Sequence, residues 1–374
     1  MRLRLLPVRI EHLKLENFRN MQSIALFPCK TVNIVYGNNA QGKTNLLEAV
    51  WLLSGAKSFR GARDADQIRF GENQALIESE FYQAGRVQTA KLQISGQKSA
   101  WLNEIKQDSV TALAGIFTAV VFSPSHLGLV KDGPAGRRKF LDTSICQITP
   151  RYIRMIGQYQ RILVQRNTLL KDIAYAPSLM DTLDVWDEKL AALGGAILRL
   201  RMEYTRRLNT EAAKIYKGIS MDREQLSLCY RPLGLRLEEG QSKEEIFSLL
   251  LEQTVKNRPE DLRNGVTSVG PHRDDLEILI NGRSVRSFGS QGQQRSAVLS
   301  LKLAESRCIG EILKEHPVIL LDDVMSELDQ SRREYLLNHL TGSQIFITCC
   351  DKGYFSQLAE GRVFSMEKGC LTEE

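Results

Sequence analysis

The chain has 374 residues, 43% of them apolar and 25% charged, a globular composition that excludes a disordered or fibrous protein. The net charge of +6 permits a polyanionic partner without requiring one. At roughly 150 residues per domain, the length allows about two or three compact units. The cysteines form no Cys-x-x-Cys pair, and no apolar run approaches the ~18 residues that span a bilayer. We therefore predict a cytoplasmic protein with reduced thiols and no membrane partner.

The first strongly patterned region is a strand, a glycine loop and a helix. Val32, Ile34 and Tyr36 alternate with other residues before Gly37, which is typical of a strand. After the loop, apolar residues recur at helical spacing over residues 45–54. Strand, loop and helix therefore follow one another without interruption.

A helical hairpin is predicted after about residue 131. Apolar and aromatic residues recur at alternating four- and three-residue steps over 152–170, and a second stripe covers 190–204. The region around Pro177 joins the two stripes, which predicts an antiparallel helical arm. We expect Tyr152 and Tyr159, on the first stripe, to be core residues rather than stacking platforms for bases.

The first helix of this hairpin also carries only basic charges between residues 151 and 171. Such a face either follows a phosphate backbone, releasing counterions, or is an ordinary solvated surface. The sequence leaves both interpretations open. The basic residues are Arg151, Arg154, Arg161, Arg166 and Lys171.

A mixed pattern returns after about Asn264. Asn281-Gly282, a dipeptide suited to the positive φ of a two-residue turn, lies between predicted strands at 276–280 and 283–288. A helix is predicted from about Gln294 to Leu313. Short buried strands are predicted at 318–321 and 345–348.

The glycine loop matches the P-loop pattern and stands where that pattern requires, between a strand and a helix. Its backbone N–H groups and the helix N-terminus would face phosphates, and Lys43 would reach the β- and γ-phosphates of ATP. Thr44 would place its hydroxyl on Mg²⁺. The predicted loop consists of Gly37, Asn38, Asn39, Ala40, Gln41, Gly42, Lys43 and Thr44.

Two carboxylates follow the predicted strand at 318–321. Ligands gather at this end of the strands in open parallel sheets. Asp322 would hold Mg²⁺, and Asp323 would orient or deprotonate the attacking water. Asp322 lies far beyond Lys43, so an insertion divides the nucleotide-binding core. We predict an α/β ATPase head at 1–122 and 263–374, with an inserted, mainly helical arm domain at 123–262.

A second candidate anion site precedes the helix at 294–313. Ser290 and the amide of Gly292 would present hydrogen bonds and a helix dipole to an anion. The alternative interpretation is a helix N-cap that contains a glycine.

Together these motifs resemble a known family. The P-loop, residues 290–293, the Asp322-Asp323 pair and residues 326–329 are similar to the Walker A, signature, Walker B and D-loop elements of ABC-type ATPases. Four further blocks, in order over nearly the whole chain, are similar to the RecF family of DNA-repair ATPases. These blocks are Leu15-Glu16-Asn17-Phe18-Arg19, Lys57-Ser58-Phe59-Arg60, Arg137-Arg138-Lys139-Phe140-Leu141-Asp142 and Gly270-Pro271-His272-Arg273-Asp274-Asp275-Leu276.

The resemblance implies an ATP-dependent DNA-binding protein of recombinational repair and replication restart that forms a homodimer on ATP. It further implies binding to double-stranded DNA and single/double-strand junctions, recombinase loading, and RecR and RecO as partners. Ser290, Gly292 and Gln293 would contact the γ-phosphate across the dimer interface, and Asp329 would line that interface. Arg60 and Arg63 are further candidates for contact with nucleotide or DNA.

One departure from the wider ABC pattern concerns the segment after the strand at 345–348. ABC transporters carry a histidine there, whereas this chain has Thr348-Cys349-Cys350. Thr348 is the candidate for that place, and we expect a weak, slow, DNA-associated ATPase. His272 is expected to be structural or interfacial. Two alternatives stay open, the nucleotide-binding subunit of a membrane transporter and a P-loop kinase.

Overall fold

The computed structural model describes residues 6–238, 240–350 and 361–374. The chain forms two compact units. Unit 1 consists of Met1–Leu127, Ile215–Asp222 and Arg295–Glu374, and unit 2 of Gly128–Lys214 and Arg223–Gln294. These units differ from the predicted division at 122 and 262. The main difference is that residues 263–294, predicted to belong to the head, lie in unit 2. The physical reason is strand pairing, since the strand Leu226–Arg231 of the predicted arm pairs with Asp275–Ile280.

Within its described residues, unit 1 contains two six-stranded sheets. The first is mainly parallel and has the order β17-β16-β4-β15-β14-β9. The second is antiparallel and has the order β3-β2-β5-β6-β7-β8. The parallel sheet comprises β4 (Val32–Tyr36), β9 (Ala119–Phe122), β14 (Val318–Asp322), β15 (Ile345–Cys349), β16 (Arg362–Glu367) and β17 (Cys370–Glu373). The antiparallel sheet comprises β2 (Arg9–Phe18), β3 (Met21–Leu26), β5 (Ala75–Gln83), β6 (Arg86–Ser95), β7 (Gln97–Leu102) and β8 (Ile105–Lys106).

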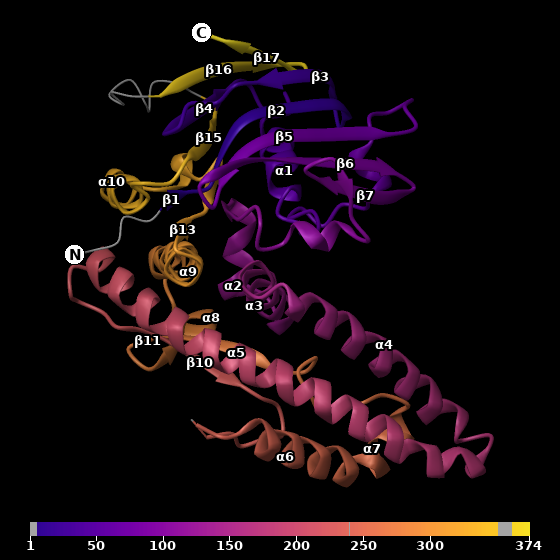
Figure 1. Cartoon of the computed structure of the whole chain (residues 1–374). Helices are drawn as coiled ribbons and strands as arrows, with labels where there is room; N and C mark the ends of the chain where they lie inside the picture. The colour runs from indigo at the N-terminus through magenta and orange to yellow at the C-terminus, as the bar shows by residue number, and fades with distance from the viewer. Residues whose placement is uncertain (1–5, 239, 351–360) are drawn as a thin grey trace. The chain divides into compact units, whose positions relative to one another are not determined.

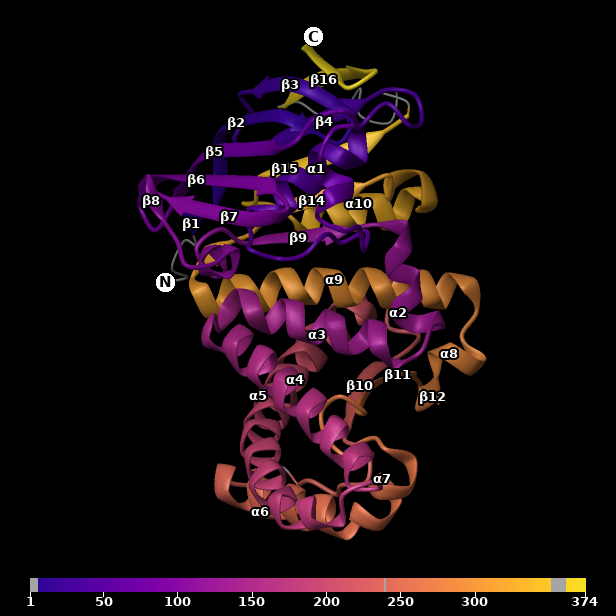
Figure 2. The ribbon, with the colours of Figure 1, turned by 90° about the vertical axis from the view of Figure 1, so that its right-hand side faces the viewer.

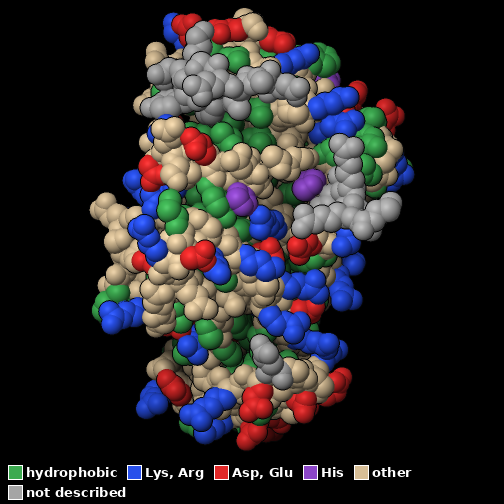
Figure 3. All heavy atoms as spheres, turned by 90° about the vertical axis from the view of Figure 1, so that its left-hand side faces the viewer, with side chains coloured by type: hydrophobic (Ala, Val, Ile, Leu, Met, Phe, Trp, Pro, Cys, Tyr) green, Lys and Arg blue, Asp and Glu red, His purple; other side chains and the backbone are tan. Residues whose placement is uncertain are grey.

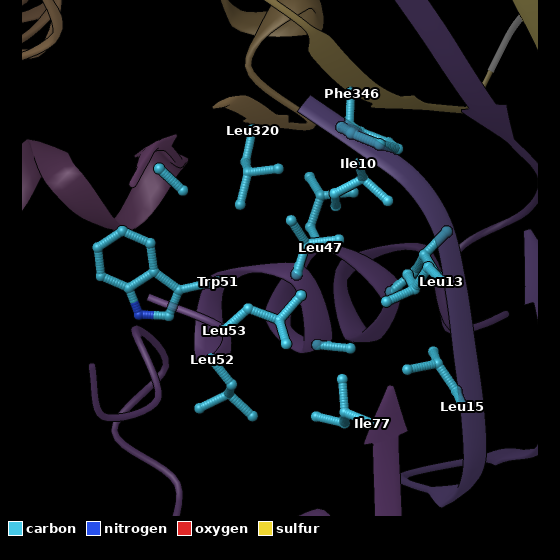
Figure 4. Close-up of a cluster of buried hydrophobic side chains, with 14 of the residues drawn as sticks. Ile10, Leu13, Leu15, Leu47, Trp51, Leu52, Leu53, Ile77, Leu320 and Phe346 are labelled. Carbon is cyan, nitrogen blue, oxygen red and sulfur yellow. The ribbon is translucent and has the colours of Figure 1, made fainter. Parts of the chain in front are cut away.

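The helix α1 (Lys43–Leu52) packs in the main core of unit 1, with side chains from both sheets around it. Leu47 of α1 lies among Leu13 of β2, Leu320 of β14 and Phe346 of β15 (Figure 4). Burial of this apolar surface is the main driving force for joining the two sheets, at about 25 cal/mol per Å². The helix that follows the predicted P-loop is thereby held at a fixed position against the parallel sheet.

The central strands of the parallel sheet are buried on both faces. All five residues of β14 are buried, and so are Asn33, Ile34 and Val35 of β4. The alternation predicted for Val32, Ile34 and Tyr36 is therefore not the pattern of burial, because a parallel strand is covered on both sides. Figure 1 shows α10 (Gln330–His339) on the other side of β15 from α1.

The remaining elements of unit 1 are short, apart from one long helix. The long helix α9 begins at Gln291, in unit 2, and ends at Leu313. The short elements are β1 (Leu6–Pro7), β13 (Glu315–His316) and the 3-10 turns Ala65–Gln67, Val110–Leu113, Pro124–Leu127 and Met325–Glu327.

Unit 2 is mainly helical (Figure 2). Its helices α4 and α5 form the predicted hairpin, joined by a 3-10 turn at Pro177–Thr182. A small antiparallel sheet has the order β10-β11-β12. The elements are α2 (Gly128–Lys131), α3 (Pro134–Ile148), α4 (Arg151–Asp172), α5 (Leu183–Ile219, ending in unit 1), β10 (Leu226–Arg231), α6 (Lys243–Lys256), α7 (Arg258–Asn264), β11 (Asp275–Ile280), β12 (Arg283–Ser284) and α8 (Val285–Phe288).

Four residues of the first helix of the hairpin are buried, and one of them is an arginine. Tyr152 and Tyr159 are 0% and 3% exposed, which confirms that they are core residues. Arg166 is also 0% exposed and donates hydrogen bonds to Asp187 (2.6 Å) and Asp261 (2.7 Å). Arg166 therefore does not belong to a solvated or phosphate-binding face. The other four basic residues of α4 are exposed.

The turn between β11 and β12 forms as predicted. Asn281 and Gly282 have φ values of 48° and 74°, and Ile280 pairs with Arg283 across the turn. The second strand is shorter than predicted, because Val285–Phe288 forms the helix α8. Among the described residues, no helix is long and apolar enough to cross a membrane.

Two sequence blocks singled out above contact each other inside unit 2. Arg137 of α3 donates to Asp275 at 2.7 Å, and Arg138 donates to the backbone carbonyl of Asp274 at 2.7 Å. The His272 ring bridges Tyr159 and the carbonyl oxygen of Thr267, at 2.7 and 3.0 Å. A carbonyl only accepts, so Nε2 of the neutral ring donates to Thr267 and Nδ1 accepts from the Tyr159 hydroxyl. The blocks therefore stabilise the interior of this unit, and His272 is structural.

Candidate nucleotide site

The predicted P-loop connects β4 to α1, and its glycines are required by the backbone. Gly42 caps α1 with a φ of 118°. Gly37 has a φ of 153°, and a Cβ atom there would lie 2.3 Å from the carbonyl oxygen of Met366. Side chains at either position would be strained or would collide. The loop therefore keeps the close backbone path that a phosphate cradle needs.

A turn from the C-terminal end of the chain holds this loop from outside. The carbonyl oxygen of Gln41 accepts hydrogen bonds from Nδ2 of Asn20 and from the N–H of Gly369, both at 2.9 Å. The side-chain oxygen of Gln41 accepts from the N–H of Lys368 at 2.6 Å. The turn between β16 and β17 is thus a clamp on the P-loop. No local signal in the sequence predicted it, because the partners are more than 300 residues apart.

Lys43 is turned into the loop. Its side chain is largely buried, at 7% exposure, and Nζ donates to the backbone carbonyls of Gly37 and Asn38, the latter at 2.9 Å. Nζ also lies 3.7 Å from Sγ of Cys350. The ammonium group is therefore held at the centre of the loop, where phosphate oxygens would replace its present acceptors.

The acidic pair meets the P-loop. Oγ1 of Thr44 donates to Oδ1 of Asp322 at 2.7 Å, although the two residues are 278 positions apart. Parallel pairing explains the approach, since β4, β14 and β15 all end at the same edge of the sheet. In this register Asp322 lies opposite Thr348, whose hydroxyl donates to the same oxygen at 3.1 Å.

The two aspartates have different environments. Asp322 is 6% exposed, and burial raises the pKa of its carboxyl group, while the hydrogen bonds from Thr44 and Thr348 oppose that shift. Asp323 is only partly buried and has a φ of 53°, which is unusual for a residue other than glycine. The Asp322 carboxylate is thus enclosed beside the hydroxyls of Thr44 and Thr348, and Asp323 lies at the open edge of the site.

An open depression of about 1220 Å³ surrounds the P-loop. Arg60, Asp323 and Thr348 lie on its wall with the loop, and Phe70 is fully exposed at its margin. Arg60 donates to the side chain of Asn45 at 2.8 Å. The structure therefore places Arg60, but not Arg63, beside the loop.

The two N-terminal family blocks meet at a buried carboxylate of α1. Arg19 donates two hydrogen bonds of 2.9 Å to Glu48, which is 0% exposed, and Ser58 donates to the same group. These blocks fix α1, and with it the P-loop, against the antiparallel sheet.

The predicted signature residues form a helix cap. The Ser290 hydroxyl accepts from the N–H of Gln293 at 3.2 Å, and the side chain of Gln293 accepts from the N–H of Ser290 at 2.8 Å. This reciprocal pair is a capping box at the start of α9, with Gly292 in the first turn. Asp329 similarly caps α10 by accepting from the N–H of Arg332 at 2.9 Å. Contacts of these residues with a nucleotide stay a prediction.

Sequence reasoning missed Cys350 and Asn20. Thr348, the candidate for the place of the ABC histidine, contacts the acidic pair, whereas Cys350 contacts Asn39 of the loop at 3.0 Å. Cys350 lies in the segment without the ABC histidine, and that departure was the available signal. Asn20 directly follows the block that ends at Arg19, and that position was the available signal.

Comparison with known proteins assigns the chain to a family. The family model for the RecF/RecN/SMC N terminal domain matches residues 9–372. The chain is 40% identical to the DNA replication and repair protein RecF of Agathobacter rectalis, over 96% of this chain and 98% of that protein. It is also 40% identical to the RecF protein of Clostridium acetobutylicum, over 97% and 99% of the two chains.

Solved structures agree. A structure described as the recombination mediator protein RecF-ATPrS in the RecFOR pathway has a TM-score of 0.92 and 37% identity, covering 99% of both chains. The Smc head domain of Pyrococcus furiosus, at 16% identity and a TM-score of 0.54, shares the fold alone. The predicted α/β ATPase head is thereby confirmed, and the chain belongs to the RecF family of DNA replication and repair proteins.

Proposed function

We propose that the chain is an ATP-binding and ATP-hydrolysing protein of recombinational repair and replication restart, whose affinity for DNA depends on ATP. The contact between Thr44 and Asp322 carries this proposal. It joins the two halves of a divided P-loop core at the edge of a parallel sheet, which is the arrangement that phosphoryl transfer requires.

ATP would bind along the P-loop, residues 37–44. Backbone N–H groups at the start of α1 suit the phosphates because a helix N-terminus carries a partial positive charge. Lys43 would exchange its bonds with the Gly37 and Asn38 carbonyls for phosphate oxygens. Arg60, on the wall of the depression, adds a second positive charge near the same phosphates.

The residues around Asp322 fit Mg²⁺. Thr44 and Asp322 offer a hydroxyl and a carboxylate oxygen, 2.7 Å apart, and oxygen ligands are those that Mg²⁺ prefers. When bound, the ion would neutralise charge on the β- and γ-phosphates. Asp323, at the open edge, would orient and deprotonate the attacking water.

The site is open, so we propose that a second copy of the chain completes it on ATP binding. Ser290, Gly292 and Gln293 of that copy would contact the γ-phosphate, and Asp329 would line the interface. The exposed Ser290 hydroxyl supports this role, because its oxygen accepts within the capping box while its hydrogen can be donated to a phosphate oxygen. Hydrolysis would be weak and slow, and it would release the dimer.

DNA is the proposed macromolecular partner, as double-stranded DNA and single/double-strand junctions. The exposed residues Arg151, Arg154, Arg161 and Lys171 are candidates for contact with its backbone. On the face shown in Figure 3 basic and acidic side chains are intermingled, so net charge alone does not locate the surface. The RecFOR pathway named for the related structure supports RecR and RecO as partners. Recombinase loading with these partners, in the cytoplasm, is part of the proposal.

Family membership argues against the two alternative functions. A transporter subunit and a P-loop kinase share the P-loop, but relatives that are 40% identical over nearly the whole chain are RecF proteins.

Replacement of the P-loop lysine tests the nucleotide role. Lys43→Met is expected to abolish ATP-dependent dimerisation, measured by light scattering after gel filtration with ATP and Mg²⁺. Lys30→Met, at an exposed lysine of the same unit outside the site, is the matched control and should dimerise like the wild type. If ATP left the wild-type oligomeric state unchanged, or if Lys43→Met dimerised normally, the proposal would fail.

Salt titration tests the DNA role. Phosphate contacts predict that log affinity falls linearly with log salt concentration. We expect tighter binding to junction DNA with ATP than with ADP, at every salt concentration. A flat salt response, or equal affinity with both nucleotides, would contradict the proposed role.

A further inference from the structure

The backbone of Asp323 is held at both ends by side-chain hydroxyls. Its N–H donates to Oγ1 of Thr348 at 2.9 Å, and its carbonyl oxygen accepts from Oγ of Ser326 at 2.9 Å. Between these bonds the residue has a φ of 53°. A left-handed conformation costs a residue with a side chain about 1–2 kcal/mol, so it persists only where surrounding contacts favour it.

Thr348 is suited to this role by its place in the sheet. It is 1% exposed and lies opposite Asp322 in the β14–β15 register. The hydroxyl has one hydrogen, and the carboxylate oxygen of Asp322 at 3.1 Å is nearer than the carbonyl of Leu321 at 3.4 Å. By donating to Asp322 and accepting from Asp323, the hydroxyl fixes the two acidic residues relative to each other.

Ser326 connects Asp323 to an exposed segment. It lies in the turn Met325–Glu327, where the buried Met325 anchors the backbone and Ser326 itself is exposed. This turn belongs to the segment predicted to face the second copy of the chain. A displacement of the turn on dimerisation would therefore reach the carbonyl of Asp323 directly.

We propose that Thr348 and Ser326 are positioning residues, whose hydroxyls hold the Asp323 backbone in its left-handed turn and so aim its carboxylate at the attacking water. The inference rests on the proposed role of Asp323 in ATP hydrolysis. Neither hydroxyl needs to touch the nucleotide, so the expected effect is on kcat and not on binding of ATP.

The central variant is Thr348→Val, which keeps the shape of the side chain and removes the hydroxyl. We expect kcat for ATP hydrolysis to fall about 10- to 100-fold, the size of effect that follows misplacement of a reacting group. KM and the affinity for a fluorescent ATP analogue should stay within about threefold, since ground-state binding is unaffected. Thr348→Ser should restore kcat, and Ser326→Ala should lower it.

The matched control is Thr118→Val. Thr118 is also buried in unit 1, at 1% exposure, but its hydroxyl has no hydrogen-bond partner among the described residues. The control should keep wild-type kcat. A loss of kcat in Thr118→Val equal to that in Thr348→Val would show a general effect of packing and overturn the inference.

A double-mutant cycle separates this inference from the proposed function. In an Asp323→Asn background, the effect of Thr348→Val on kcat should be much smaller, because the part of that effect that acts through the Asp323 carboxylate is already lost. If Asp323→Asn alone left kcat unchanged, the proposed role of that carboxylate would fail. If the Thr348 effect were undiminished in that background, the positioning role would fail instead.

A structural readout decides the inference without activity. In a crystal structure of nucleotide-free Thr348→Val, φ of Asp323 is expected to leave the left-handed region. An unchanged φ, or a Thr348→Val protein that loses affinity for the ATP analogue and keeps kcat, would overturn the inference. If Thr348→Val fails to fold, the exposed Ser326→Ala provides the same measurements, because it removes the other hydroxyl that holds the Asp323 backbone.

Discussion

Replacement of Arg166 by methionine tests whether this arginine of α4 stabilises the interior of unit 2, unlike the exposed arginines of the same helix. Arg166 is fully buried and bonds to Asp187, Asp261 and Thr267. Methionine has a similar length but no charge, so two buried carboxylates would lose their shared cation. Breaking a buried ion pair in this way costs about 3–5 kcal/mol.

Remaining contacts place the expected cost toward the lower end of this range. Asp187 keeps a hydrogen bond of 2.6 Å from Arg258, and Asp261 keeps bonds of 2.9 and 2.6 Å from the N–H and hydroxyl of Ser268. With a urea m-value of about 2–3 kcal/mol per M, the unfolding midpoint of unit 2 should fall by about 1–2 M. Circular dichroism in the helix band reports this transition, because unit 2 is mainly helical.

Arg161→Met is the matched control, since Arg161 is exposed on the same helix. Its midpoint should stay near that of the wild type, within about 0.5 kcal/mol. If the exposed face contacts DNA, Arg161→Met should instead weaken DNA binding and reduce the salt slope by about 1. Equal midpoints for Arg166→Met and Arg161→Met would refute the assignment of Arg166 to the interior.

Two further substitutions give sharp expectations. Gly369→Ala should weaken ATP binding and destabilise unit 1 more than Gly85→Ala does. The φ values of the two glycines are similar (80° and 78°), but a Cβ atom at 369 would lie 2.3 Å from the carbonyl oxygen of Asn20, whereas a Cβ atom at 85 has no neighbour within 4 Å. Equal urea midpoints and equal ATP affinities of the two variants would contradict this. Burial lowers the pKa of His272 to about 4, below its usual 6.5, so its contribution to stability is complete above pH 6.5 and is lost as pH falls toward 4. Wild type should therefore lose up to about 3 kcal/mol more than His272→Gln over that range, and parallel pH profiles of the urea midpoint would disprove this.

Local patterns predicted the core of the site. The P-loop, the strand before the acidic pair and the Asn281-Gly282 turn each have a short signal in which nearby residues dictate the backbone. The approach of Thr44 to Asp322 fits the Mg²⁺ role predicted separately for each residue, and it arises because parallel strands bring their carboxyl ends together.

Arg166 shows where the prediction was wrong and why. Its charge placed it with the other basic residues of α4, but its spacing placed it on the apolar stripe, four residues before Leu170. The spacing was the better guide, because burial of a helix face depends on position, and partners on α5 and α7 satisfy the charge. Those partners are distant in sequence, so no local pattern showed them.

The family blocks act mainly on the scaffold. Arg19 and Ser58 converge on Glu48, and Arg137 contacts Asp275. Motif comparison identified the blocks as related to a family, but it did not show which block contacts which. That information depends on the tertiary structure.

The clamp between Gln41 and the final hairpin has a consequence for synthesis on the ribosome. The loop emerges early, but Lys368 and Gly369 are translated 327 or more residues later. At about 5–20 residues per second, this delay is on the order of 20–70 s. A nascent chain therefore cannot form this clamp until residues 368 and 369 have been made, and a product of premature termination before residue 368 would be released with only Asn20 holding the Gln41 carbonyl.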